Sequence, residues 1–179
     1  RPGVVVQAHG AIAPGSEMGA MANLQMEQHQ KDFATVRTEA KERWNKELGR
    51  IRAKFDSPRD STIFYTSLYH VLFAPQVWSD VTGDYMGANG MIQRSPDFQN
   101  YTTWSLWDTY RALHPLATLM MQDKLADWAK TMMAICKEHG ELPMWHLHST
   151  DTYCMVGAPG VPVLADMILK GGKGFDYEK

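Results

Sequence analysis

The sequence has little of three features that would assign a class at once: cysteine, net charge and long apolar runs. Its 179 residues include two cysteines, Cys136 and Cys154, and no Cys-x-x-Cys pair, which excludes a disulfide-rich scaffold and a cysteine zinc site. The formal net charge is −2, so electrostatics give no reason to expect nucleic acid or an anionic membrane as partner. No run reaches the roughly 18 apolar residues of a membrane span, and none is predicted.

What the sequence does have is a helical pattern after residue 30. A hydrophobic content of 44% and a charged content of 21% are typical of a soluble globular protein. Val4–Ala8 is predicted to form a short β-strand, and no clean period follows it as far as Gln30. Apolar spacing and capping residues then predict five helices, over residues 32–55, 60–73, 103–121, 123–140 and 162–169. Asp32 and Asp123 are predicted to cap the first and the fourth helix, and Pro115 to kink the third or divide it in two. The residues predicted to face inward in the fourth helix are Leu125, Trp128, Met132 and Ile135. Residues 76–102 are predicted to form a long loop with short strands, and residues 141–160 a second loop.

The most informative segment is the run over residues 101–116, in which two tryptophans, an aspartate and an arginine stand among apolar residues. In the predicted helix Trp104, Trp107 and Arg111 share one face, with Asp108 beside Trp107. An aromatic ring packs on the C–H groups of a sugar, and a carboxylate accepts hydrogen bonds from its vicinal hydroxyls. The run therefore suits a sugar-binding wall. The alternative is a buried, tryptophan-rich helix with a satisfied Asp–Arg pair.

The same run is similar, at nearly every position, to the hallmark segment of the exo-acting α-mannosidases of glycoside hydrolase family 92. Further blocks resemble that family in the family's order: Ile63–His70, Ala74-Pro75, Ser79–Val81, Leu142–Trp145, Cys154–Gly157 and Val161–Asp166. Weaker matches at Ala22–Leu24 and Trp44–Leu48 extend the resemblance to almost the whole chain. The chain is therefore identified as a member of this family.

The resemblance implies a mainly α fold, a partial (α/α)6 toroid with a short N-terminal β segment from a preceding β-sandwich. Residues 1–30 would be the end of the sandwich and a connector, 31–56 a linker helix, and 57–179 the first part of an incomplete catalytic toroid. It also implies calcium as cofactor, a mannose-containing glycan as substrate and a secreted or periplasmic location. Family members are several times longer, so the chain is expected to be a fragment.

The loop over residues 141–160 is where the resemblance implies the catalytic acid. Inverting glycosidases use one carboxylic acid to protonate the leaving oxygen and a second carboxylate to activate water. Alignment on Trp145 and Cys154 places Asp151 where the family's catalytic glutamate is expected, and His146 at its other glutamate. Aspartate is shorter by one methylene, about 1.5 Å of reach. Either the backbone lies closer, or the leaving group needs little protonation, as in a mannosyl phosphodiester, or His146 or His148 donates the proton.

Other polar residues receive simpler interpretations. Trp107 and Asp108 are the leading candidates for contact with the sugar, followed by Trp145. His70 and His114 lie in helical motifs and are predicted to be hydrogen-bonded core residues.

A metal site is a further interpretation of His146, His148 and Asp151, because imidazole and carboxylate suit zinc. Such a trio is a common coincidence, so no metal ligand is assigned. By resemblance, the calcium ligands and the general base are expected beyond Lys179.

Three functions remain open from the sequence. The leading hypothesis is an inverting, calcium-assisted α-mannosidase that releases terminal mannose. The second is a mannose- or glycan-binding relic, in which the changes at Asp151 and His146 have removed catalysis. The third is a structural fragment, inactive alone, whose exposed apolar faces support an oligomer.

Overall fold

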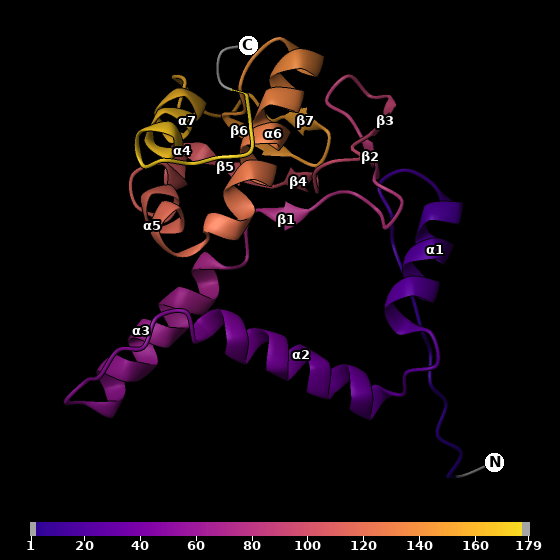
Figure 1. Cartoon of the computed structure of the whole chain (residues 1–179). Coiled ribbons are helices and arrows are strands. Elements are labelled where there is room, and N and C mark those ends of the chain that lie inside the picture. The colour runs from indigo at the N-terminus through magenta and orange to yellow at the C-terminus, as the bar shows by residue number, and fades with distance from the viewer. Residues whose placement is uncertain (1–2, 177–179) are drawn as a thin grey trace.

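The structure is a computed structural model that describes residues 3–176, and these residues are mainly helical (Figure 1). The helices are α1 (Glu17–Gln28), α2 (Phe33–Leu48), α3 (Pro58–Val71), α4 (Leu106–Thr109), α5 (Leu113–Met120), α6 (Gln122–His139) and α7 (Gly160–Leu169). The strands are β1 (Gln76–Val77), β2 (Asp84–Met86), β3 (Ile92–Arg94), β4 (Tyr101–Thr102), β5 (Trp104–Ser105), β6 (Trp145–Leu147) and β7 (Thr150–Asp151). Within this range no helix is long and apolar enough to cross a bilayer.

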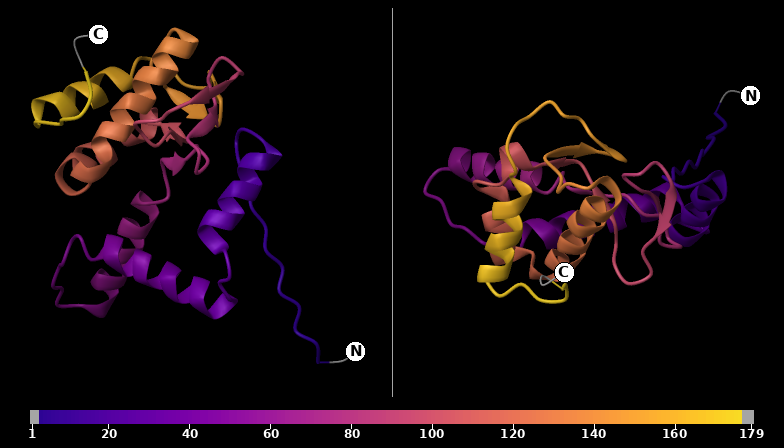
Figure 2. Two further views of the ribbon diagram at one scale, coloured as in Figure 1. Left: turned by 45° about the vertical axis from the view of Figure 1, so that its right-hand side comes forward. Right: turned by 90° about the horizontal axis from the view of Figure 1, so that it is seen from above.

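The part of the chain from β1 onward is compact. Helices α5, α6 and α7 pack on one another beside an antiparallel sheet in the order β5-β6-β7 (Figures 1 and 2). Two antiparallel pairs, β1 with β4 and β2 with β3, form the loop over residues 76–102, which confirms the short strands predicted there. Strands β6 and β7 in the second loop were not predicted. A core of buried apolar side chains includes Trp104, Leu106, Met132 and Met167.

Helix α6 follows its prediction closely. The four residues predicted to face inward, Leu125, Trp128, Met132 and Ile135, are all buried. The helix ends at Gly140, whose φ of 97° is the left-handed conformation that glycine adopts without a Cβ clash. Its start differs, because Met121 precedes the first turn and no side chain caps it. The predicted cap, Asp123, lies inside the first turn instead.

The helix predicted from about residue 103 to 121, kinked or divided at Pro115, is wrong. Thr103 has a φ of 65°, and residues 104–105 then form β5, which pairs with β6. A short α4 follows, and α5 begins only at Leu113. Pro115 lies in the first turn of α5, where a missing N–H is tolerated, so it does not cause the division. Pairing with a strand about forty residues away overrides the local helical spacing.

Residues before β1 form an extended arm of three helices that bury little. Helix α1 was not predicted; Ser16 caps it by accepting a hydrogen bond from the Gly19 N–H at 3.0 Å. Helix α2 begins after its predicted cap, Asp32, but ends at Leu48, not near residue 55. Helix α3 begins at Pro58, earlier than predicted.

The β-strand predicted at Val4–Ala8 does not form. These residues have no regular secondary structure, and the valines at positions 4 to 6 are exposed. Figures 1 and 2 show this segment running away from the compact part. A strand needs a partner for its backbone N–H and C=O groups, and the described residues supply none there.

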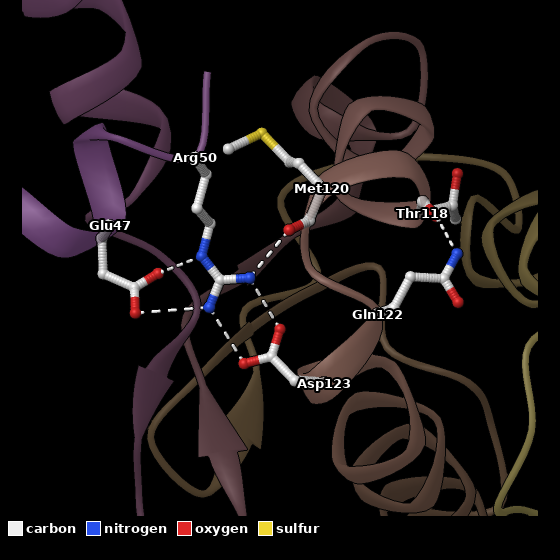
Figure 3. A network of polar contacts seen from close by, with 6 residues as sticks. All are labelled: Glu47, Arg50, Thr118, Met120, Gln122 and Asp123. Atoms are coloured by element: carbon white, nitrogen blue, oxygen red, sulfur yellow. Dashed lines mark hydrogen bonds and ion pairs between the residues drawn. The ribbon is translucent and has the colours of Figure 1, made fainter. Parts of the chain in front are cut away.

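Arg50 connects the arm to the compact part (Figure 3). Its Nη1 donates to Asp123 Oδ1 at 2.7 Å and to the Met120 carbonyl at 2.8 Å, and its Nε donates to Glu47 at 2.7 Å. The hydrogen bonds to Asp123 and Glu47 raise the pKa of Arg50, and Arg50 lowers the pKa of Asp123, mainly through the hydrogen bond. One guanidinium therefore joins the end of α2 to the junction of α5 and α6.

Candidate functional site

The sheet β5-β6-β7 brings together the two segments that the sequence singled out. Trp104 and Ser105 of β5 lie opposite His146 and Trp145 of β6, and His146 lies opposite Asp151 of β7. Three of the five predicted site residues, Trp145, His146 and Asp151, thus lie in one small sheet, and Trp107 and Asp108 follow its strand β5 in α4. Local periodicity carried no signal for this pairing, because it joins segments distant in sequence.

Trp107 and Asp108 are the more accessible part of the tryptophan-rich run. Trp104 is completely buried in the core, Trp107 is half-buried, and Asp108 is exposed. The predicted shared face of Trp104, Trp107 and Arg111 is therefore wrong. Among the described residues Arg111 has no ion pair with Asp108; its Nε donates to the Tyr110 hydroxyl at 2.9 Å. Asp108 follows Trp107 in α4 and is exposed, so its carboxylate can accept hydrogen bonds from a sugar.

Trp107 contacts residues just before β6 and after β7. Its backbone N–H donates to the Met144 carbonyl at 3.4 Å. A Cβ placed on Gly157 would lie 3.5 Å from the Trp107 ring, and Gly157 has a φ of 88°. That conformation favours glycine, which lets the backbone run close along the indole. The Cys154–Gly157 block is therefore part of the same wall.

Asp151 is buried, with 7% of its surface exposed. Its Oδ2 accepts from the backbone N–H groups of Met144 at 2.9 Å and Trp145 at 3.1 Å, and its Oδ1 accepts from the Tyr153 N–H at 3.0 Å. Both oxygens thus accept from main-chain donors that lie just before β6, at its start and after β7. The role of Asp151 as general acid stays a prediction, and in this geometry the carboxyl group does not face an open space.

His146 is even more buried, at 2% exposure, and neither ring nitrogen has a hydrogen-bond partner among the described residues. Burial lowers its pKa to about 4, a shift that the nearby Asp151 charge only partly opposes. The imidazole is therefore neutral near pH 7 and has no imidazolium proton to donate. This disfavours His146 as the alternative acid.

His148 lies at the turn between β6 and β7 and is exposed. Its ring stacks on Trp78 with centroids 4.8 Å apart and planes 16° apart. Its φ is 56°, and Thr103 and Tyr153 also have positive φ, at 65° and 53°. Such conformations are costly for residues with a side chain, above all for a β-branched threonine, and they concentrate at functional sites. Three of them adjoin this one sheet.

The two histidines predicted as core residues differ. His70 is exposed, so that prediction is wrong for it. His114 is 2% exposed, packed between Trp104 and Trp128, but its ring nitrogens have no hydrogen-bond partner among the described residues. Burial lowers the pKa of His114 to about 4.

The described residues do not offer a metal site. Residues 3–176 contain no group of three or more His, Cys, Asp or Glu side chains placed to hold an ion. The neighbouring carboxylates Asp80 and Asp84 already have partners: Asp80 Oδ1 accepts from the Thr82 and Asp84 N–H groups at 3.0 Å, and Asp84 pairs with Arg94 at 2.9 Å. These residues do not fit a calcium ion, so no chemical step here involves one.

A cavity of about 560 Å³ lies elsewhere, between the arm and the compact part. Trp44, Leu72, Tyr101 and Trp128 are among its lining residues, and none of the five predicted site residues is. Hollow space alone therefore does not identify the candidate site. Its identification depends on the aromatic wall, the buried carboxylate and the strained backbone around one sheet.

A half-buried tryptophan beside an exposed aspartate, on a mainly helical scaffold, defines a candidate carbohydrate site, and comparison with known proteins gives the family. Residues 19–179 match the model of the glycosyl hydrolase family 92 catalytic domain. The chain belongs to glycoside hydrolase family 92. A search of curated protein sequences returned no match.

Solved structures agree with this assignment. The chain is similar to the family 92 alpha-mannosidase BT3965 from Bacteroides thetaiotaomicron, solved in complex with mannoimidazole, with 40% identity and a TM-score of 0.87 over 93% of this chain. It is also similar to the inverting mannosidase BT2199 from the same organism, with 28% identity and a TM-score of 0.83 over 91% of this chain. In both comparisons the chain spans only 22% of the other protein's length.

Proposed function

We propose that this chain is part of the catalytic domain of an exo-acting, inverting α-mannosidase that releases terminal mannose from glycans. The observation that carries the proposal is the 40% identity, over 93% of this chain, to a solved alpha-mannosidase that binds mannoimidazole. The inverting outcome is supported by the likeness to a protein described as an inverting mannosidase. A secreted or periplasmic location and a partial (α/α)6 toroid after a β-sandwich belong to the same proposal.

The described residues supply the sugar-binding half of the chemistry. Trp107 and Trp145 offer apolar rings to the C–H face of a mannose, and Asp108 accepts hydrogen bonds from a pair of hydroxyls. Inversion also needs an acid and a base with room between them for water. The base and the ligands of a calcium ion are proposed to lie outside these residues, because no described cluster fits the ion.

Activity of the longest natural form of the protein tests the proposal. It would be assayed against α-1,2-, α-1,3- and α-1,6-linked mannobiose and a mannosyl phosphodiester, with and without a chelator. We expect release of β-mannose, seen by NMR before mutarotation, and loss of activity with chelator. Release of α-mannose would contradict inversion, and full activity with chelator would contradict the calcium requirement.

The binding wall is tested by Trp107→Ala and Asp108→Asn. Each is expected to raise the KM for α-mannosides by about tenfold or more, since a buried stacking or hydrogen-bonding contact contributes about 1–2 kcal/mol. Trp44→Ala, in the arm, is the matched control and should leave the KM unchanged. Unchanged KM in both site variants would remove them from the sugar site.

A second candidate function is supported by the loop geometry. Because Asp151 faces backbone donors and His146 is neutral, a noncatalytic mannose-binding protein also fits. Absence of turnover of every substrate, together with measurable mannose binding by calorimetry, would favour this alternative over the enzyme.

A further inference from the structure

We propose that Asp151 is a positioning residue, which fixes the backbone of Trp145 and the segment that supports Trp107 and so builds the sugar wall from two parts of the chain. This inference rests on the proposed function for its meaning, but its geometry is independent of it. It differs from the acid role in what the carboxylate does: Asp151 acts through the main chain of its neighbours and not on the scissile bond.

The contacts of Asp151 are all with main-chain donors. Met144 and Trp145 donate to Oδ2, and Tyr153 donates to Oδ1, at 2.9, 3.1 and 3.0 Å. The first two donors precede and begin β6, and the third follows β7. One carboxylate thus links the start of β6 to the residue that follows the end of β7, at the open end of the hairpin. Hydrogen bonds to a charged acceptor are roughly twice as strong as neutral ones.

The same hairpin end holds both tryptophans. The Trp145 carbonyl accepts from the Thr152 N–H at 3.0 Å and from the Thr152 hydroxyl at 2.9 Å. Met144, whose N–H binds Asp151, accepts from the Trp107 N–H through its carbonyl. A displacement of Asp151 should therefore move the backbone of Met144 and Trp145, and with it both tryptophan rings of the wall.

Tyr153 shows that the arrangement is held against a backbone preference. Its φ of 53° is unfavourable for a residue with a side chain, and its N–H points to Asp151. The turn precedes Gly157, which lies against the Trp107 ring. Asp151 supplies the acceptor that stabilises the turn.

A general acid needs different surroundings. It must present an oxygen to the leaving group and exchange a proton with solvent between turnovers. Asp151 is 7% exposed, and each oxygen already accepts at least one backbone hydrogen bond. The described geometry therefore presents the carboxylate to three backbone N–H groups and not to a leaving group.

The test compares Asp151→Asn with the control Asp97→Asn, an exposed aspartate paired with Lys130, in the longest natural form of the protein. Each would be assayed on an α-mannobiose and on 2,4-dinitrophenyl α-mannoside, whose leaving group needs little protonation. For a positioning residue, Asp151→Asn should raise KM by about tenfold to a hundredfold on both substrates, with the alkaline limb of the pH profile retained. Loss on mannobiose alone, together with loss of that limb, would show an acid and overturn the inference.

A second measurement does not depend on activity. Hydrogen exchange should accelerate at the amides of Met144, Trp145 and Tyr153 in Asp151→Asn and stay unchanged in Asp97→Asn. Unchanged exchange at these three amides would overturn the positioning role even if the enzyme reading stands. Absence of turnover in the unmodified protein would instead contradict the proposed function. The exchange result would then decide the positioning role of Asp151.

Thr152→Val is a milder variant of the same hairpin, for use if Asp151→Asn fails to fold. It keeps the shape of the side chain and the Asp151 contacts but removes the hydroxyl donor to the Trp145 carbonyl. The same rise in KM on both substrates, smaller than for Asp151→Asn, is expected. Equal KM to the unmodified protein would show that the wall does not depend on this support.

Discussion

The arm and the compact part use similar apolar patterns with opposite results. Helix α2 has the most regular apolar stripe in the sequence, yet none of its residues is buried. Helix α6 has a stripe of the same kind, and six of its residues are buried. Periodicity therefore predicts that a helix forms and which face is apolar, but not what covers that face. Burial depends on the surface that covers a helix. In this chain the compact part covers the apolar face of α6, and no comparable surface covers α2 among the described residues.

The largest difference in stability between the two parts is expected when one tryptophan is removed from each. Trp104→Ala should lower the free energy of unfolding by about 3–5 kcal/mol, because a completely buried aromatic ring leaves a cavity. Trp44→Ala should cost only about 1 kcal/mol, since this ring is half-buried and packs mainly on Tyr69, at 4.6 Å. Urea unfolding followed by circular dichroism measures both. Equal losses would show that the arm is as tightly packed as the core.

Two buried histidines of the compact part should make the free energy of unfolding depend on pH. The pKa of His114 and of His146 is lowered from 6.5 to about 4 by burial. The unfolded chain therefore binds more protons between pH 6.5 and 4, and the free energy of unfolding falls as pH falls through that window. The loss is on the order of 3 kcal/mol per histidine by pH 4.

His146→Phe should flatten this pH dependence and stabilise the protein near pH 5, because it removes a buried polar ring that lacks partners. Met132→Leu is the control: it perturbs the core without changing the proton balance. Chemical unfolding at pH 7 and pH 5 measures the difference. A pH slope as steep in His146→Phe as in the unmodified protein would contradict the assigned shift.

The fold was predictable where local signals and burial coincide. Helix α6 was, since its stripe faces a core and Gly140 ends it in a conformation that glycine favours. Helix α1 was not, because residues 17–28 show no clean apolar period, and the only buried residue of the helix is Gly19. The helix expected after Thr103 failed because pairing of β5 with β6 outweighs local propensity.

The candidate site was predictable as residue types but not as geometry. Trp107, Asp108, Trp145 and Asp151 were identified, and the sheet ties three of them together. That Asp151 faces backbone donors follows from the hairpin and the Tyr153 turn, which no spacing rule encodes. The contribution of Gly157 had a signal, a glycine within a matching block, but its contact with Trp107 needed the structure.

The link between the two parts is tested at Arg50, with a smaller expected effect. Arg50→Met removes its hydrogen bonds to Asp123, Glu47 and the Met120 carbonyl, and should cost about 1–2 kcal/mol because the group is only partly shielded from water. Hydrogen exchange should rise in α2 and stay unchanged in α6. Arg37→Met, on the exposed side of α2, is the control. Faster exchange throughout α6 would show that the two parts unfold as one unit.

The smallest effect is expected at the start of α3, within the arm. The Ser57 hydroxyl oxygen accepts from the N–H groups of Arg59 at 3.2 Å and Asp60 at 3.4 Å, and so caps two backbone donors that the helix cannot pair itself. Ser57→Ala should lower the free energy of unfolding by about 1 kcal/mol, and Ser57→Asp should restore it by supplying another capping acceptor. Exchange at those two amides locates the effect. An effect of Ser57→Ala as large as that of Trp104→Ala would mean that arm and core form a single cooperative unit, because a cap in a weakly buried arm would then be as costly to lose as the centre of the core.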